Sequence, residues 1–311
     1  MKAAQINEYG EPSVIKISEV EKPSPKESQV LVEVHASSLN PFDSSVRAGR
    51  VKDKMPLELP VTLGGDIAGV VVELGAGVDN VAVGDKVYGQ AAVFGGNSGA
   101  FAEYAATKSG QVAKAPQNLD FKQAASLPLV GVSALQALTE EIKLKSGQKV
   151  FIHGGSGGIG SIAIQIAKNI GAYVATTATG EQIDVVKKLG ANEVIDYKSQ
   201  DFVEALRDYD AVFDTVGGDD FTKSLNILKK GGIAVSMNAN ADEAKVKELG
   251  VTAIHHSTKV NTADLDKLRE LVEAGDIKPQ VGKVFPLEQI VEAFEARESG
   301  SAQGKVVIDI Q

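Results

Sequence analysis

Lys149–Gly160, KVFIHGGSGGIG, is the stretch that decides the fold class of this chain. An apolar run typical of a β-strand leads directly into glycines with G-x-G-x-x-G spacing at Gly155, Gly157 and Gly160. The following residues, Ile159–Ile170, carry apolar side chains at the i, i+3, i+4 spacing of a helix. A strand, a glycine turn and a helix in immediate succession predict a dinucleotide-binding unit.

We expect a different physical requirement for glycine at each of these three positions. One makes the tight turn, one lets the backbone approach a pyrophosphate, and one lets the helix pack closely on the strand. The free N–H groups at the start of the helix would bind the phosphates. The cofactor-binding residues predicted in the turn are Gly155, Ser156, Gly157, Gly158, Ile159 and Gly160.

The composition limits the partners of the chain. It has 311 residues, 43% of them hydrophobic, which is enough apolar material for two ordinary domains. The formal net charge is −9, from 32 basic and 41 acidic side chains, and no basic block occurs. No apolar run reaches the length of a transmembrane helix. We therefore expect a small-molecule substrate, and neither a nucleic-acid nor a membrane partner.

The chain contains no cysteine. This excludes disulfides, thiolate-bound metals, iron–sulfur clusters and cysteine nucleophiles, and it fits a reducing compartment. Met1–Glu8 carries an early acidic residue and lacks the apolar core of a signal peptide. We therefore expect a cytoplasmic location.

The pattern of secondary structure changes at Phe121. The residues before it read as all-β, with glycine and proline between short β-type runs. After it, helices and strands alternate, which predicts an α/β fold with a doubly wound parallel (Rossmann) sheet. Beyond Thr258 we predict helices at Leu265–Ala274 and Gln289–Arg297 and a last strand at Lys305–Ile310. The predicted strands of the parallel sheet are Val150–His153, Tyr173–Thr177, Glu193–Asp196, Ala211–Asp214, Gly232–Met237 and Val251–His255.

Short motifs along the whole chain are shared with one known family. They are SLNPFD at 38–43, RAG at 47–49, GGDIAGVV at 64–71, ASLP at 125–128, GVSA at 131–134, DTVGG at 214–218 and GKVV at 304–307. Taken together, they make the chain similar to the medium-chain dehydrogenase/reductase superfamily. The greatest resemblance is to its zinc-free quinone oxidoreductase, or zeta-crystallin-like, branch.

The resemblance implies a divided architecture. Residues 1–121 and 261–311 would form a β-rich, GroES-like catalytic domain, and residues 122–260 a Rossmann nucleotide-binding domain. The last strand, Lys305–Ile310, would rejoin the N-terminal sheet.

The resemblance also implies site residues. It places Asn40 and Ser133 near the nicotinamide and the reacting carbonyl, as catalytic residues and cofactor contacts, and it assigns further cofactor contacts to Val216, Gly217 and Lys305. Because Asn40 precedes a proline, a structural role as a turn residue is an open alternative.

The chain departs from the zinc-dependent relatives at the positions of their ligands. Those relatives place a cysteine where this chain has Asn40, and His-Glu where it has Gly65-Asp66. The four histidines show no spacing suited to a catalytic metal site. We therefore predict that no metal is bound.

Other titratable residues have simpler expected roles. Asp43 and Arg47 are four residues apart and are expected to pair with each other. His153 is expected to pack at a strand end. His255 and His256 are adjacent near a strand end, so their side chains would face opposite ways at the surface or sheet edge.

The expected reaction follows from the absence of a metal. Without zinc, no group is available to polarise an alkoxide, so alcohol oxidation fits poorly. Reduction of a conjugated carbonyl needs mainly positioning and charge stabilisation. We predict a zinc-independent, NADPH-dependent reductase of a quinone or an α,β-unsaturated carbonyl. Some relatives have a lysine or a tyrosine where this chain has Ser45 and Val51, so a non-enzymatic NADPH-binding redox sensor or structural protein stays open as an alternative.

The choice of cofactor depends on the end of the second strand. NAD enzymes place an acidic residue there to bind the ribose hydroxyls, whereas this chain has Thr177 and Thr179. Because these two hydroxyl groups carry no negative charge, they tolerate a 2′-phosphate. In addition, Tyr197 and Lys198 resemble the pair of residues that flanks this phosphate in relatives. We therefore expect NADPH, with NADH as a possible substitute.

The sixth predicted strand, Val251–His255, is expected at an edge of the sheet. An uncovered edge strand pairs readily with another chain, and related reductases often associate in this way. We therefore expect a homodimer. The alternative is an edge covered by His256–Asn261, which would give a monomer.

Overall fold

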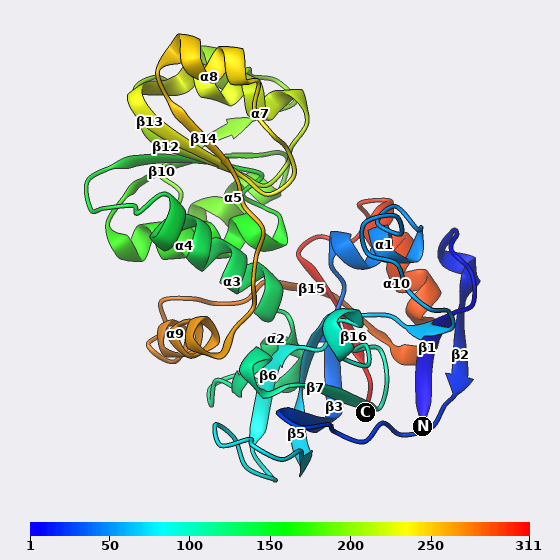
Figure 1. Cartoon of the computed structure of the whole chain (residues 1–311). Helices are drawn as coiled ribbons and strands as arrows, with labels where there is room; N and C mark the ends of the chain where they lie inside the picture. The colour runs from blue at the N-terminus through cyan, green and yellow to red at the C-terminus, as the bar shows by residue number, and fades with distance from the viewer. The chain divides into compact units, whose positions relative to one another are not determined.

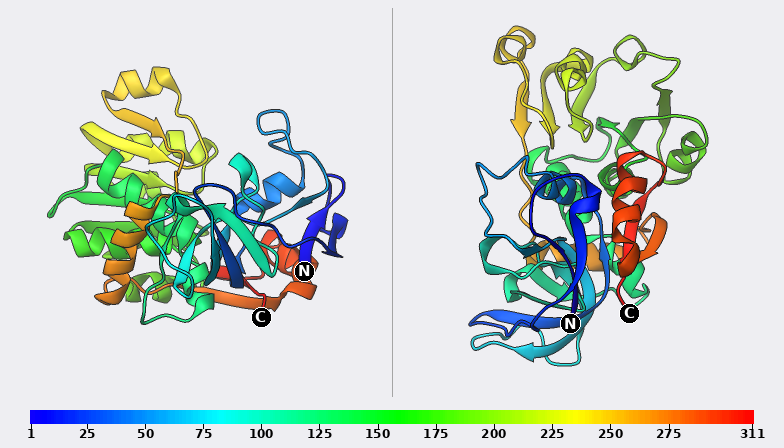
Figure 2. Two further views of the ribbon diagram at one scale, coloured as in Figure 1. Left: turned by 60° about the horizontal axis from the view of Figure 1, so that its bottom comes forward. Right: turned by 90° about the vertical axis from the view of Figure 1, so that its right-hand side faces the viewer.

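The computed structural model describes residues 1–311 and separates into two compact units. The β-rich unit comprises Met1–Leu129, Val260–Ala274 and Pro279–Gln311, and the parallel-sheet unit comprises Val130–Lys259 and Gly275–Lys278. Both termini lie in the β-rich unit (Figure 2).

The first boundary between the units lies later than the expected change at residue 121. Helix α2 (Phe121–Ala125) follows that point but contacts strands β3 and β5 of the β-rich unit. The chain therefore enters the parallel-sheet unit only after Leu129.

The parallel-sheet unit confirms the predicted doubly wound fold. All neighbouring strands of its six-stranded sheet are parallel. From β9 the chain first adds strands on one side of the sheet and then, from β12 onward, on the other side, so the strand order reverses between β9 and β12. This reversal is the point where ligands commonly bind in such sheets. In spatial order the strands are β11 (Glu193–Asp196), β10 (Tyr173–Ala178), β9 (Lys149–His153), β12 (Tyr209–Asp214), β13 (Leu228–Ser236) and β14 (Thr252–His255).

Helices cover both faces of this sheet (Figure 1). Helices α4 (Gly158–Ile170) and α5 (Gln182–Lys188) lie on one face, whereas α7 (Asp219–Ser224) and α8 (Glu243–Leu249) lie on the other. The amphipathic pattern of α4 explains its position, because its apolar side chains are buried against β9 and β10. The unit also contains α6 (Phe202–Ala205) and most of α3 (Pro128–Gln136).

The β-rich unit contains two sheets. The larger has the order β15 (Val281–Pro286), β16 (Lys305–Asp309), β3 (Gln29–Ser38), β5 (Asp66–Leu74), β6 (Lys86–Gln90) and β8 (Val112–Lys114), and β7 (Tyr104–Lys108) also pairs with β3. The smaller has the order β2 (Ile15–Glu19), β1 (Lys2–Ile6) and β4 (Val61–Thr62). Strand β16 is antiparallel to β3, which confirms that the last strand rejoins the N-terminal sheet.

The expectation that the first 120 residues are all-β was wrong in one place. Helix α1 (Pro41–Arg47) follows β3 directly. Asn40 has extended backbone, Pro41 supplies a first helical residue without an N–H, and the Asp43 carboxylate accepts the Asn40 N–H at 2.7 Å. The other helices of the unit are α2, α9 (Thr262–Glu273) and α10 (Ile290–Glu298). None of the helices combines the length and the apolar character needed to cross a membrane.

Candidate cofactor and active site

Two glycines of the turn between β9 and α4 are required by packing. A Cβ on Gly155 would lie 2.1 Å from Thr176 Oγ1, and a Cβ on Gly160 would lie 2.2 Å from the Gly154 carbonyl oxygen. Gly155 N–H also donates to the Thr177 carbonyl at 3.2 Å. These glycines let helix α4 begin directly against the neighbouring strands.

Gly157 is different because the protein's own packing constrains it less than Gly155 and Gly160. Its φ of −74° suits any residue, and a Cβ would meet only the Gly154 carbonyl oxygen, at 3.3 Å. Gly157 is also exposed and is the N-cap residue of α4, a helix of 13 residues. Exposed backbone at the start of a long helix fits a pyrophosphate group, because the first N–H groups of a helix can bind an anion.

A buried carboxylate fixes the loop that carries Val216 and Gly217. Asp214 ends β12 and accepts hydrogen bonds from Ser236 Oγ at 2.6 Å and from Gly217 N–H at 3.0 Å. Burial acts to raise the pKa of Asp214, but donation from His153, Ser236 and Gly217 outweighs it and holds the pKa below its usual range. Gly217 has a φ of +86°, a backbone conformation that favours glycine.

His153 packs at the end of its strand, as predicted, and it also contacts Asp214. Its Nδ1 lies 3.1 Å from Asp214 Oδ1, and its ring stacks with Phe151 at a centroid distance of 5.6 Å. Sequence reasoning missed the pair with Asp214, although His153 and Asp214 stand directly opposite each other in the β9–β12 register. The pair ties the glycine turn to the Val216 loop at the reversal point of the sheet.

The ends of β10 and β11 bring the predicted selectivity residues together. Ala178 of β10 stands opposite Asp196 of β11, and Tyr197 and Lys198 follow at once with exposed side chains. The Asp196 carboxylate accepts a hydrogen bond from the Thr179 side chain, and this bond is the main reason why the pKa of Asp196 lies below its usual value. Asp196 is therefore an acidic residue near the strand tip that the sequence analysis overlooked.

Two predicted residues of the parallel-sheet unit are held by internal bonds. Thr177 is buried, and its hydroxyl accepts the Gly154 N–H at 2.9 Å, so it supports the glycine turn. Ser133 lies in α3 with its Oγ 2.7 Å from Thr258 Oγ1. Val216 differs from both, because 52% of its surface is exposed.

In the β-rich unit, Asn40 and Lys305 belong to one buried network. Lys305 Nζ donates to Asn40 Oδ1 at 2.6 Å and to the Leu39 carbonyl at 3.0 Å. Asn40 Nδ2 donates to Asp66 Oδ2 at 2.8 Å, and the same carboxylate oxygen lies 3.7 Å from Lys305 Nζ. The structure therefore places the Lys305 ammonium against Asn40, within the β-rich unit.

The two carboxylates of this network are strongly desolvated. Asp66 also accepts hydrogen bonds from Ser38 Oγ at 3.0 Å and from the Leu129 N–H at 3.0 Å. Burial raises the pKa of Asp66, and Lys305 and Asn40 oppose that shift. Burial likewise raises the pKa of Asp43 to about 7, against the hydrogen bond from the Asn40 backbone.

The expected pair of Asp43 and Arg47 does not form. Asp43 is turned toward the start of α1, where it accepts the Asn40 N–H. Arg47 instead contacts Glu298 Oε1 at 3.2 Å and lies over the Phe294 ring. The capping bond at the helix start and the packing of Arg47 on α10 replace the pair within α1.

The positions of the family's zinc ligands do not fit a metal site. They hold Asn40, Gly65 and Asp66, and the Lys305 ammonium is the cation next to Asp66. No group of three or more His, Cys, Asp or Glu side chains is placed to bind a metal. His255 is exposed as expected, whereas His256 is buried, with Nδ1 3.4 Å from Glu141 Oε1. The two side chains therefore differ in exposure, and the expected surface or sheet-edge position is correct for His255, whereas His256, which follows the edge strand β14, has a buried side chain.

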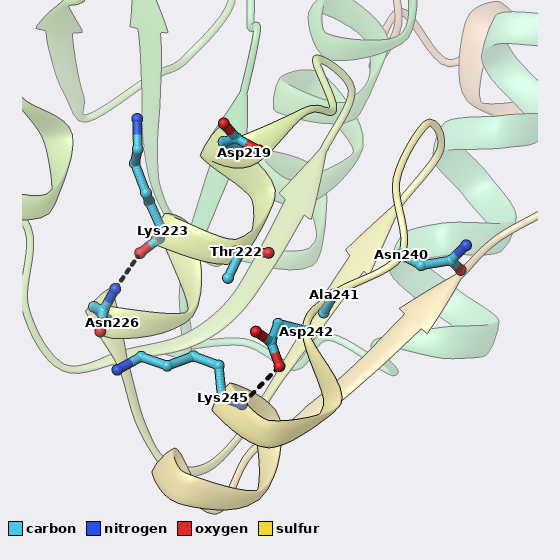
Figure 3. Close-up of a pocket in the computed structure, with 8 residues that line it drawn as sticks. All are labelled: Asp219, Thr222, Lys223, Asn226, Asn240, Ala241, Asp242 and Lys245. Atoms are coloured by element: carbon cyan, nitrogen blue, oxygen red, sulfur yellow. Dashed lines mark hydrogen bonds between the residues drawn. The ribbon is translucent and has the colours of Figure 1, made fainter.

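A polar hollow of about 580 Å³ lies between α7 and α8 on the parallel-sheet unit (Figure 3). None of the predicted site residues lines it. The lining residues are Asp219, Thr222, Lys223, Asn226, Asn240, Ala241, Asp242 and Lys245.

Comparisons with known proteins agree with the geometry. Residues 26–117 match the family model of the alcohol dehydrogenase GroES-like domain, and residues 189–308 match the model described as zinc-binding dehydrogenase. The NADPH-dependent alkenal/one oxidoreductase of Arabidopsis thaliana chloroplasts is 36% identical over 99% of this chain and 79% of its own length. The human quinone oxidoreductase is 33% identical over 99% of this chain and 97% of its own length. The solved structure of the quinone oxidoreductase from Coxiella burnetii superimposes with a TM-score of 0.92, at 37% identity, over 100% of this chain and 99% of that one.

Proposed function

The chain belongs to the quinone oxidoreductase branch of the medium-chain dehydrogenase/reductase superfamily, a family of NAD(P)H oxidoreductases, and from this premise we propose that it transfers a hydride from NADPH to a quinone or an α,β-unsaturated carbonyl. The observation that carries the proposal is the exposed backbone of Gly157 at the start of α4, where a phosphate can approach the first N–H groups of the helix. The names of the relatives supply the substrate classes and the cofactor.

The proposed cofactor site follows the carboxyl ends of the parallel strands. The glycine turn 155–160 would bind the pyrophosphate, and Val216 and Gly217 would contact the cofactor from the loop after β12. Thr179, Tyr197 and Lys198 would flank the 2′-phosphate, with Thr177 supporting the turn. NADH stays an alternative, because the Asp196 carboxylate beside Thr179 could instead accept the ribose hydroxyls.

The proposed chemistry needs few protein groups. Bound NADPH supplies the hydride that adds to the conjugated carbon. As the carbonyl oxygen gains negative charge, Asn40 would donate a hydrogen bond to it from Nδ2, which stabilises that charge. Ser133, with its hydroxyl held at Thr258, would help to position the nicotinamide. We propose that the proton comes from water.

We also propose that the enzyme works without a metal. The support is the ligand set, because Asn40, Gly65 and Asp66 with a nearby ammonium are poor ligands for zinc. Activity should survive prolonged incubation with a chelator, and metal analysis of the purified protein should find no stoichiometric zinc. Loss of activity on chelation that zinc restores would contradict this part of the proposal.

Two further proposals concern the protein as a whole. A two-fold homodimer would form through β14, which is one of the two edge strands of the parallel sheet. We propose a cytoplasmic location, which the cysteine-free composition supports.

The function is tested with a panel of quinones, 2-alkenals and enones against NADPH and NADH. We expect turnover of at least one acceptor class, with higher kcat/KM for NADPH. Tight NADPH binding without turnover of any acceptor would contradict the proposal and favour a sensor or structural protein.

A further inference from the structure

The Asn40 side chain is held by charges of opposite sign. Its Oδ1 accepts from the Lys305 ammonium at 2.6 Å, and its Nδ2 donates to the Asp66 carboxylate at 2.8 Å. Rotating the amide by 180° would place Nδ2 against the ammonium and Oδ1 against the carboxylate, so both contacts would become repulsive. All three side chains are buried, so water does not screen this arrangement.

From this geometry we infer that Lys305 is a positioning residue that acts through Asn40. The inference rests on the proposed function and deepens it. The ammonium takes one lone pair of Asn40 Oδ1, and Nδ2 keeps one hydrogen beyond the one that it donates to Asp66. Asn40 therefore offers a ligand a donor, and the adjacent positive charge strengthens that donor while it weakens Oδ1 as an acceptor.

The consequence is a preference for substrates whose oxygen gains negative charge. A carbonyl oxygen or a quinone oxygen accepts such a hydrogen bond, and the bond strengthens as the hydride arrives. Weaker electron acceptors, such as 2-alkenals, should depend on it more than strongly accepting quinones do.

Lys305 reaches Asn40 because of the topology of the sheet. Strand β16 pairs with the end of β3, with Val307 opposite Ser38, two residues before Asn40. The ammonium donates to Leu39 and Asn40 and lies beside Asp66, so its contacts are internal to the β-rich unit. This role differs from the direct cofactor contact that the family resemblance implied for Lys305.

The test compares Lys305→Met with the wild type and with Lys283→Met, a control at an exposed lysine on the neighbouring strand β15. We expect kcat for a 2-alkenal to fall about 10- to 100-fold in Lys305→Met, a loss typical for residues that orient a reacting group. The loss for a strongly accepting quinone should be smaller, and the Kd for NADPH, measured by fluorescence titration, should change less than about twofold. The control should match the wild type.

Two outcomes would overturn the inference. The first is an unchanged kcat for both acceptor classes in Lys305→Met. The second is a raised Kd for NADPH with a normal kcat at saturation, which would make Lys305 a direct cofactor contact. A wild type that reduces no acceptor would instead defeat the proposed function, and this inference with it.

Lys305→Met leaves two buried carboxylates without their cation, and such a change can prevent folding. The paired variant Lys305→Met/Asp66→Asn removes one charge of each sign and retains a side chain that can accept from Asn40 Nδ2. Its circular dichroism spectrum and NADPH affinity should match the wild type, whereas its kcat for the 2-alkenal should show the same loss. A paired variant that keeps wild-type kcat would overturn the inference.

Discussion

Asp43 links the stability of the protein to pH. Burial raises its pKa to about 7 in the native state, whereas an exposed aspartate in the unfolded chain has a pKa of about 4. Between these values the native state retains a proton that the unfolded state has lost. The contribution of Asp43 to the free energy of unfolding is therefore fully present below about pH 4 and is lost as the pH rises through about 7.

The variant Asp43→Asn should remove this dependence, because an asparagine can still accept the Asn40 N–H but does not titrate. Thermal unfolding between about pH 5 and pH 8 should show a smaller fall in Tm for the variant than for the wild type. Parallel curves for the two proteins would show that Asp43 is not protonated in the native state.

In the glycine turn, we expect different residues to be needed for folding and for cofactor binding. Gly157→Ala should fold with only a small loss of Tm, since the added Cβ meets one carbonyl oxygen at 3.3 Å and a shift of a few tenths of an ångström relieves that contact, but it should bind NADPH poorly. NADPH at about 100 times its Kd should stabilise the wild type by about 2.7 kcal/mol and this variant by much less. Thermal shift measurements check both values.

Gly160→Ala is the matched comparison, because its Cβ would lie 2.2 Å from the Gly154 carbonyl. It should lower the Tm without any ligand. If NADPH stabilises Gly157→Ala as much as the wild type, the turn does not bind the pyrophosphate.

At the scale of elements, the sequence predicted the parallel sheet well because strands buried on both faces read as continuous apolar runs. It missed α1, which is short and is defined by its N-terminal proline and capping aspartate rather than by an apolar pattern. It also missed β15, whose largely exposed residues include Gly282 and Lys283 and show no clear alternation.

The candidate site was predictable only where its residues are close in sequence. The glycine turn is one segment, and local spacing was enough to find it. The network of Asn40, Asp66 and Lys305 joins positions separated by up to 265 residues and depends on how β3, β5 and β16 pair. The pairing of His153 with Asp214 depends in the same way on the β9–β12 register. Local patterns carry no information about such pairings.

The ends of β10 and β11 should decide between the two cofactors. If Lys198 contacts the 2′-phosphate, Lys198→Glu should raise the KM for NADPH roughly fivefold, as expected for one exposed charge contact, and change the KM for NADH little. Lys230→Glu is the control, because Lys230 is exposed near the opposite, amino end of the sheet. Steady-state kinetics with both cofactors measure the difference. Equal kcat/KM values for NADPH and NADH in the wild type would refute the assignment.

At the scale of the whole molecule, the free edge of β14 is the feature that bears on assembly. His256 N–H donates to the Ser236 carbonyl of β13 at 2.8 Å. Because donors alternate between the two sides of a strand, the N–H of the preceding residue, His255, faces away from β13 and is available to a second chain.

His255→Pro should therefore weaken a dimer by removing this donor, whereas His255→Ala keeps it and should assemble like the wild type. Light scattering at micromolar concentration should report a dimer for the wild type and His255→Ala, and a shift toward the monomer for His255→Pro. A monomeric wild type would rule out the dimer.

The proposed function requires that hydride passes from NADPH to the conjugated carbon of the substrate. The most direct measurement uses NADPH deuterated at the transferring position of its nicotinamide, with a 2-alkenal as acceptor and mass spectrometry and NMR of the product. We predict a saturated aldehyde that carries deuterium on the β-carbon, formed equally well after treatment with a chelator. An alcohol with deuterium on the former carbonyl carbon, or a saturated aldehyde without deuterium on its β-carbon, would contradict this mechanism.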